Sequence, residues 1–409
     1  MTAPPVRIER LAAGGDGVGH LADGRVVFVP RTAPGELVAL RDLKPSRRFA
    51  RARVAAILEP SPDRVEPRCA HYTADDCGGC QLQHVAAPVQ RTARAAFVGD
   101  ALRRLGRLDV PDPLLEPAEH EFGYRSKLTL AATPDGRRIG LHPLDRPDAV
   151  FQLDRCHLAA EPLMELWTVL RRQRALMPPG LDRLVLRLDR AGGRHVIANV
   201  RGTTVWTQAP MLAAELDRAH VPTALWWRPE GGVARVLAGR ANGAPAPVFE
   251  QVNPAMGDRV RAFAVDRLGP VHDAEVWDLY AGIGETTAVL AAAGARVESV
   301  ERDQRAVAHA EGAGPAARRH AGPAEATVGR LEPPDLVLTN PPRTGMEAAV
   351  TAAIAAGRPR RIVYVSCDPA TLARDIVRLG SGFRLVEARA FDLFPQTAHV
   401  ETVAVLDRV

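Results

Sequence analysis

The chain has 409 residues, enough for two or three domains that each bury a hydrophobic core. Its hydrophobic fraction of 46% and charged fraction of 25% are ordinary for folded globular proteins and exclude a largely disordered chain. The first residues show no apolar run after a charged start, and no run of about 18 apolar residues occurs, so we expect neither a secretory signal nor a membrane span and predict a cytoplasmic protein.

Residues 1–60 predict a small β-barrel. Five short apolar stretches are separated by glycine-containing turns such as 14-GGDG-17. Closely spaced short strands of this kind are typical of an OB-like barrel. A proline-rich segment, 59-EPSPDRVEP-67, follows and is interpreted as a linker.

Basic residues of the predicted barrel are concentrated in 44-KPSRRFARAR-53, which holds five positive charges and no acid. The net charge of the whole chain is +5. A run like this is most often a solvated surface, but it also suits a polyanion. Arg47, Arg48 and Arg51, with Arg53 beside them, are therefore candidate contacts to a nucleic acid.

Residues 61–245 predict a mixed α/β domain. A helix is expected over 89–105, and short strands follow it. The expected strands are 127–133, 138–143, 184–190 and 194–202.

Residues 246–409 alternate strands with helices of 10–14 residues, which predicts a doubly wound parallel sheet of the Rossmann-like type. The last two strands follow one another directly, so we expect a final β-hairpin. The expected strands before this hairpin are 275–281, 296–301, 325–329, 335–340 and 361–367.

Four of the five cysteines lie in the predicted central domain. An odd number without a signal peptide argues against disulfides and for a metal site or a nucleophile. Cys69, Cys77, Cys80 and Cys156 are enough for a tetrahedral thiolate site that binds zinc or an iron–sulfur cluster. Zinc ribbons prefer two C-x-x-C pairs, and only Cys77 and Cys80 form one. Unligated buried cysteines are the alternative interpretation.

A strand, a glycine turn and a helix start follow one another in 278-DLYAGIGETT-287. Gly282 and Gly284 let the backbone approach a ligand, and the helix start offers free N–H groups. Glu301 ends the next strand, where an acid can accept both ribose hydroxyls of an adenosine. The missing third glycine favours S-adenosylmethionine over a dinucleotide. A plain tight turn is the alternative.

Two further strand ends carry candidate chemistry. In 339-TNPPRTG-345 two prolines make a rigid loop at the edge where α/β sheets bind ligands. Asn-Pro-Pro motifs occur in nucleic-acid base methyltransferases. Cys367 ends the apolar run of 362-IVYVSCDPATLARD-375 and lies far from the other cysteines.

Together these motifs resemble the RNA uracil-5-methyltransferases of the bacterial iron–sulfur type, and the resemblance covers nearly the whole chain. The N-terminal barrel is similar to the TRAM RNA-binding domain of these enzymes. The matching elements are 69-CAHYTADDCGGCQLQH-84, 124-YRSK-127, Cys156, 249-FEQVNP-254, 278-DLYAGIGETT-287, 340-NPPRTG-345, 363-VYVSCDPATLARD-375 and 391-FDLFPQTAHVE-401.

The resemblance implies covalent catalysis. Carbon 5 of uracil is a poor nucleophile until a thiolate adds to carbon 6, so Cys367 is expected to be the nucleophile and Glu401 the base. A free thiol of pKa ~8.5 is only slightly ionised at neutral pH. The site must lower that pKa or accept a small thiolate fraction, and Arg343 is the expected electrostatic aid.

The resemblance also implies the ligand sites. Phe249 is expected to be the aromatic residue that holds the base stack open where the target base leaves it, and simple core packing is the alternative. Asn340 stands where the family usually has Asp, which removes a charge beside the cofactor, and Ala281 stands where it often has Cys. The residues expected at S-adenosylmethionine are Gln251, Tyr280, Gly282, Glu301 and Asn340.

For the four upstream cysteines the resemblance favours a 4Fe–4S cluster that folds the central domain and shapes an RNA surface. The expected substrate is RNA, ribosomal RNA rather than transfer RNA, bound by a monomer. Two alternatives stay open: a transfer-RNA methyltransferase, and an RNA-binding protein with a vestigial methyltransferase domain. A radical S-adenosylmethionine enzyme is excluded because its compact C-x-x-x-C-x-x-C motif is absent.

Overall fold

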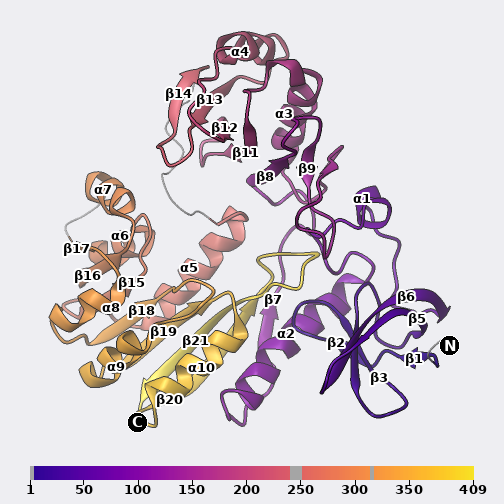
Figure 1. The fold of residues 1–409 in the computed structure, drawn as a ribbon. Coiled ribbons are helices and arrows are strands. Elements are labelled where there is room, and N and C mark those ends of the chain that lie inside the picture. The colour runs from indigo at the N-terminus through magenta and orange to yellow at the C-terminus, as the bar shows by residue number, and fades with distance from the viewer. Residues whose placement is uncertain (1–3, 240–250, 314–316) are drawn as a thin grey trace.

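A computed structural model describes residues 4–239, 251–313 and 317–409. Phe249 lies outside these residues. Within these residues the chain forms three sheets, one in each of the regions expected from the sequence, and Figure 1 shows the central sheet above the other two. None of the described helices is long and apolar enough to cross a membrane.

The N-terminal sheet has six strands, one more than the five expected, because the first apolar stretch is divided into two short strands. Their order is β1-β5-β6-β4-β3-β2. Every second residue of β4 is buried, and the side chains of Val6, Ile8, Val27 and Val38 form the core. The strands are β1 (Val6–Arg7), β2 (Arg10–Leu11), β3 (Gly17–His20), β4 (Val26–Val29), β5 (Leu37–Pro45) and β6 (Phe49–Glu59).

The central sheet has seven strands in the order β10-β9-β8-β11-β12-β13-β14. Two amphipathic helices, α3 (Glu161–Arg172) and α4 (Ala209–Arg218), pack their apolar faces into its core around Trp167 and Trp206. The strands are β8 (Lys127–Ala132), β9 (Ile139–Leu141), β10 (Phe151–Gln152), β11 (Leu181–Leu188), β12 (Arg194–Val200), β13 (Thr223–Arg228) and β14 (Arg235–Ala238).

The C-terminal sheet has the order β17-β16-β15-β18-β19-β21-β20-β7. Strands β15 to β19 are parallel, and β21 and β20 form the expected antiparallel hairpin. The strands are β15 (Glu275–Leu279), β16 (Arg296–Glu301), β17 (Arg318–Ala321), β18 (Leu336–Thr339), β19 (Arg361–Ser366), β20 (Phe383–Phe391) and β21 (Glu401–Arg408). The helices are α5 (Pro254–Leu268), α6 (Glu285–Ala292), α7 (Gln304–Ala313), α8 (Ala324–Thr327), α9 (Ala348–Gly357) and α10 (Pro369–Leu379).

One expected strand is wrong. Residues 325–329 fall in α8 and a following 3₁₀ turn, and the third strand of the alternation is β17 instead. The reason is local, because Ala and Glu favour helix and the Thr327 hydroxyl closes the turn by donating to the Pro323 carbonyl at 2.9 Å.

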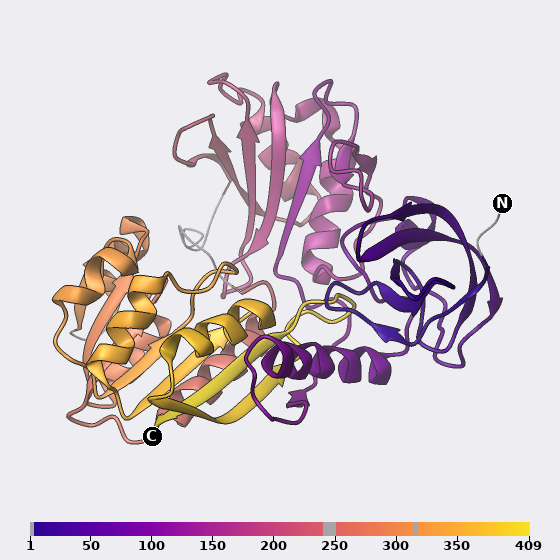
Figure 2. The same cartoon turned by 60° about the horizontal axis from the view of Figure 1, so that its bottom comes forward.

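Part of the segment expected in the central domain packs with the C-terminal sheet instead. Strand β7 (Leu114–Glu116) pairs in parallel with β20 at the edge of that sheet. Helix α2 (Ala87–Arg104) lies beside α10 in both views, and its Val98 and Leu102 belong to the same core as Tyr364 (Figures 1 and 2). The region between the barrel and the central sheet therefore supports the C-terminal sheet.

Candidate active site

Cys367 and Glu401 lie at the same edge of the C-terminal sheet. Ser366 pairs with Thr402 across the antiparallel strands β19 and β21. Cys367 directly follows β19, and Glu401 is the first residue of β21. Asp368 then caps α10 by accepting hydrogen bonds from the backbone N–H groups of two residues of its first turn, each at 3.0 Å. The strand, the cap and the helix fix Cys367 opposite Glu401.

Burial dominates the protonation of both groups. The Glu401 side chain is only 2% exposed, its Oε2 has no hydrogen-bond partner, and burial raises its pKa to about 8. Burial raises the pKa of the Cys367 thiol to about 11; the Glu401 carboxylate acts in the same direction, and Arg343 lowers it. The free chain therefore holds a mostly protonated thiol. Of the two routes expected from the sequence, this supports a small reactive thiolate fraction.

Arg343 reaches this edge from the loop after β18 and is held by a residue that the sequence reasoning did not single out. The guanidinium Nη2 donates to Nδ1 of His399 at 3.3 Å. Burial and the nearby Arg343 lower the pKa of His399, which keeps the ring neutral and able to accept this bond. His399 lies within 391-FDLFPQTAHVE-401, so the motif contained it without showing a role.

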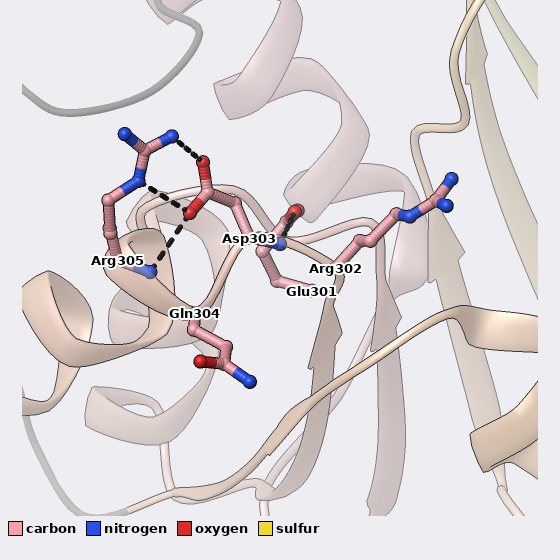
Figure 3. Close-up of a pocket in the computed structure, with 5 residues that line it drawn as sticks. All are labelled: Glu301, Arg302, Asp303, Gln304 and Arg305. Carbon is pink, nitrogen blue, oxygen red and sulfur yellow. Dashed lines mark hydrogen bonds and ion pairs between the residues drawn. The ribbon is translucent and has the colours of Figure 1, made fainter. Parts of the chain in front are cut away.

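The glycine turn and Glu301 form one braced unit. The Gly282 N–H donates to Glu301 Oε2 at 2.9 Å, and the Asp303 N–H donates to Oε1 at 2.8 Å. Gly282 and Gly284 have φ values of 58° and 78°, which glycine adopts readily. An open pocket of about 610 Å³ is lined by residues 301–305, and Figure 3 shows Glu301 and Asp303 side by side at its wall.

Glu301 is thus less free than the sequence implied, because each of its oxygens already accepts a backbone hydrogen bond. A carboxylate has about four lone-pair sites, so two acceptor positions remain for a ligand. Its partial exposure leaves those positions accessible from the pocket.

The other residues expected at the cofactor lie near the same edge. Asn340 follows β18 and is exposed, and its backbone N–H donates to the Leu279 carbonyl at 3.2 Å. Tyr280 follows β15 with a φ of 62°, and its hydroxyl has a pKa raised chiefly by burial. Gln251 comes just before α5, and its buried Oε1 has no partner among the described groups. That unpartnered oxygen is free for a ligand donor.

Two buried aspartates support this edge, and the sequence reasoning missed them. Asp278 in β15 accepts hydrogen bonds from the hydroxyls of two threonines in α6, at 2.7 and 2.6 Å, and burial raises its pKa to about 6. Asp375 in α10 accepts from the Met346 N–H at 2.7 Å and from the Tyr364 hydroxyl at 2.8 Å. These bonds tie the first turn of α6 and the loop after β18 to the sheet. Both aspartates were inside quoted motifs, but only their burial distinguishes them.

The basic run on the barrel divides into two groups. Arg47 and Arg48 are exposed, and Arg51 is exposed although it pairs with Asp16 at 3.2 Å. Arg53 instead forms ion pairs with two acids outside the barrel, Asp76 at 3.1 Å and Asp145 at 2.8 Å. Arg53 therefore fastens the barrel to the cysteine loop.

The four upstream cysteines share one neighbourhood. Cys69, Cys77 and Cys80 are 7–8% exposed, Cys156 is half-buried, and all four are free thiols. Burial raises the pKa of Cys77 to about 11 and that of Cys80 to about 12, and the charge of Cys156 acts on each of the other three. Mutual electrostatic effects of this kind require the thiols to be close.

The four cysteine side chains are not arranged around the position of a single metal ion. Across residues 4–239, 251–313 and 317–409, no three or more His, Cys, Asp and Glu side chains are placed to hold a metal ion. Four clustered thiols without disulfides fit a thiolate-ligated group by their chemistry and burial. A multi-iron cluster separates its thiolates more widely than one ion does.

Comparison with known protein families gives two matches. The tRNA (uracil-5-)-methyltransferase family matches residues 333–409, which include Cys367 and Glu401. The TRAM domain family matches residues 4–55, the strands of the N-terminal barrel.

Relatives and a solved structure match along the whole chain. A Thiobacillus denitrificans protein named 23S rRNA (uracil(1939)-C(5))-methyltransferase RlmD is 33% identical over 99% of this chain and 100% of its own. A Thermosynechococcus vestitus protein named uncharacterized RNA methyltransferase is 33% identical over 98% of this chain and 97% of its own. The crystal structure of Pyrococcus abyssi tRNA (uracil-54, C5)-methyltransferase in complex with S-adenosyl-L-homocysteine aligns with a TM-score of 0.73 at 21% identity, over 98% and 99% of the two chains. The chain therefore belongs to the RNA uracil-5-methyltransferase family and carries a TRAM domain at its N-terminus.

Proposed function

We propose that the protein transfers a methyl group from S-adenosylmethionine to carbon 5 of a uridine in RNA through a covalent adduct on Cys367, with Glu401 as the base. The observation that carries the proposal is the placement of these two groups on adjacent strand ends. Glu401 is buried with one unpartnered oxygen, as a base waiting for a substrate proton would be. A vestigial domain would have no need to keep this costly carboxylate beside a thiol.

The proposed reaction has three steps. The Cys367 sulfur forms a bond to carbon 6, and the electron pair of the C5–C6 double bond moves toward the carbonyl oxygen as an enolate. Carbon 5 then takes the methyl group, and the pair of the broken sulfonium bond stays on sulfur. Glu401 accepts the proton of carbon 5, the double bond re-forms, and the thiolate leaves. At a pKa near 8 about a tenth of the Glu401 side chains are ionised at pH 7, and this ionised fraction accepts a proton more strongly than an ordinary carboxylate does.

Arg343 supports the first step. Its positive charge lowers the pKa of Cys367 against the effect of burial, and the same charge faces a developing enolate. The His399 ring is neutral. It therefore positions the guanidinium of Arg343 by a hydrogen bond and does not offset its positive charge.

We propose that Gln251, Tyr280, Gly282, Glu301 and Asn340 bind S-adenosylmethionine. Glu301 has two acceptor positions left for the ribose hydroxyls, and Gln251 has a free carbonyl oxygen. Asn340 offers a carbonyl acceptor without the charge of an aspartate. The role of Phe249 against the target base stays a prediction.

The RNA is proposed to be ribosomal, since the relative named for a 23S rRNA uracil is 33% identical over nearly the full chain. Transfer RNA is the second candidate, favoured by the name of the family that matches residues 333–409. Exposed Arg47, Arg48 and Arg51 on the TRAM domain would contact phosphates. We further propose that the protein acts as a cytoplasmic monomer.

We also propose that Cys69, Cys77, Cys80 and Cys156 hold a 4Fe–4S cluster. Four clustered thiols, three of them buried, support this site. When bound, the cluster would cross-link separate segments of the chain. A redox role is not required, because methyl transfer to uracil needs no electron.

Two variants test the roles of the catalytic residues. Cys367→Ala should bind RNA but form no covalent complex, because nothing adds to carbon 6. Glu401→Gln keeps the nucleophile and should trap a methylated RNA–protein adduct that survives denaturing electrophoresis. Loss of a general base typically slows a step by ~10²–10⁴-fold, enough to make breakdown of the adduct limiting. Normal turnover by Glu401→Gln, or methylation by Cys367→Ala, would show that these roles are wrong. Mapping 5-methyluridine in cells with and without the gene identifies the RNA.

A further inference from the structure

The loop that leads into Glu401 is held by parts of the chain far away in sequence. Residues 392–400 join β20 to β21, and we call them the strap. Three of their polar side chains are buried, with Asp392 2%, Gln396 4% and Thr397 1% exposed. In both views the strap extends from the end of its sheet over α2 toward the barrel (Figures 1 and 2).

Helix α2 holds the strap with two side chains that are themselves almost fully buried. Gln90, 2% exposed, donates through Nε2 to the Gln396 side-chain oxygen at 2.9 Å. Arg94, 1% exposed, donates to the Thr397 carbonyl and to the Asp392 carboxylate, each at 2.9 Å. These contacts join residues about 300 positions apart and lie in a polar network shielded from water.

The loop after Cys80 holds the other side of the strap. The backbone N–H groups of Gln81 and Leu82 both donate to the Gln396 carbonyl, at 3.2 and 3.1 Å. The Gln90 amide also donates to the Leu82 carbonyl at 2.9 Å, so one side chain links the cysteine loop to the strap. Ala398 packs in a small apolar cluster with Leu11 of the barrel. The strap therefore contacts all three regions of the chain just before the catalytic base.

The strap does not hold this shape by its own preference. Gln396 has a φ of 69°, in the left-handed region that residues with a Cβ adopt only when surrounding contacts compensate. Its side chain and its carbonyl both receive those contacts from outside the strap. Five residues later the chain enters β21 at Glu401.

We infer that Gln90 and Arg94 are positioning residues for the methyl-transfer reaction, holding the strap so that the Glu401 carboxylate meets the proton on carbon 5. The inference rests on the proposed function for its catalytic meaning, and on the contacts of α2 for its physical basis. Neither residue touches the reacting atoms. If α2 were only a packing element, loosening it would lower every step by the same factor. A positioning role instead slows the base-dependent step more than the first step, which depends on the strap only through the contact of His399 with Arg343.

The first experiment measures the strap without any reaction. Gln90→Met removes the amide but keeps the volume, and hydrogen–deuterium exchange of peptides covering 392–400 should become at least ~10-fold faster. The matched control is His195→Gln, in which an equally buried polar residue of the central sheet, bonded to Asp189 and Trp226, is changed away from the strap. Unchanged strap exchange in Gln90→Met would overturn the inference.

The second experiment separates positioning from folding. With RNA and labelled S-adenosylmethionine, Gln90→Met should slow release of the methylated adduct more than its formation, by about 10²-fold for release if the base moves by about 1 Å. The control His195→Gln should show both steps unchanged. An equal fall in adduct formation and release in Gln90→Met, matching a fall in folded protein, would leave α2 a packing element and overturn the inference.

A second variant protects the test against misfolding. Gln396→Gly accepts the positive φ at no steric cost and removes the same amide contact from the strap side. Gln396→Gly should accumulate the adduct as Gln90→Met does. If Gln396→Gly does not accumulate it, the inference is also overturned. If the unaltered protein forms no adduct that depends on Cys367, the proposed function fails instead, and strap exchange still shows whether α2 holds the strap.

Discussion

Glu401→Gln should change the pH dependence of stability as well as catalysis. The buried carboxyl has a pKa of about 8 in the folded chain against an ordinary value of 4.5. Between these values the folded state keeps a proton that the unfolded state has lost. The stability that Glu401 contributes is therefore complete below the unfolded pKa and is lost as pH rises through the folded pKa. A glutamine of the same shape does not titrate.

The size of the effect follows from the shift. A difference of about 3.5 pKa units at about 1.4 kcal/mol per unit is on the order of 5 kcal/mol. Relative to the unaltered protein, Glu401→Gln should therefore become more stable by several kcal/mol between pH 5 and pH 9. This is a large part of the ~5–15 kcal/mol that typically holds a domain together.

Urea unfolding followed by far-ultraviolet circular dichroism, on both proteins across this pH range, measures the change. Taking the difference between the two proteins cancels every other titrating group. Glu59→Gln is the matched control, because Glu59 is exposed beside Arg7 at 2.6 Å and should give a nearly flat difference. A flat difference for Glu401→Gln as well would refute the argument that burial without a partner sets its protonation.

Three other outcomes are expected. Alkylation of Cys367 should rise roughly tenfold per pH unit between about pH 7 and 9, and Glu401→Gln should accelerate it only above about pH 8, where the carboxylate that it replaces is charged; a rate independent of pH would contradict the raised thiol pKa. Protein purified without oxygen should be brown with roughly four irons and four acid-labile sulfides per chain, and stoichiometric zinc in their place would contradict the cluster. Replacing Arg47 and Arg48 by Gln should each reduce the slope of RNA affinity against salt by about one, whereas Arg53→Gln should leave the slope unchanged, because Arg53 already pairs with acids. Equal slopes for all these variants would show that the basic run 44–53 is a solvated surface and not an RNA contact.

Much of the C-terminal sheet and its candidate site could be predicted, because the signals were local. Strands interleaved with helices specify a parallel sheet, and parallel strands bring their carboxyl ends to one edge. Cys367 and Glu401 were predicted as partners by resemblance, and the antiparallel return of β21 is what places them together.

The parts that could not be predicted depend on distant contacts. Nothing within 87–116 shows that α2 and β7 join a sheet formed by residues 275–408. Arg53 has the same local sequence context as its neighbours and differs only in facing acids from another region. His399 gains its role from Arg343, which comes from a separate loop.

The short strand β7 has a consequence for how this catalytic unit can be separated from the rest of the protein. Its three residues pair with Arg389–Phe391 and cover the outer edge of β20. A fragment that began after the central sheet would lack this strand and expose a row of unpaired N–H and C=O groups along that edge, beside the already exposed Val386. Bare edges of this kind recruit other strands, so the fragment should self-associate. The catalytic unit is therefore not a transplantable module, since part of its sheet is encoded more than 130 residues before its first helix.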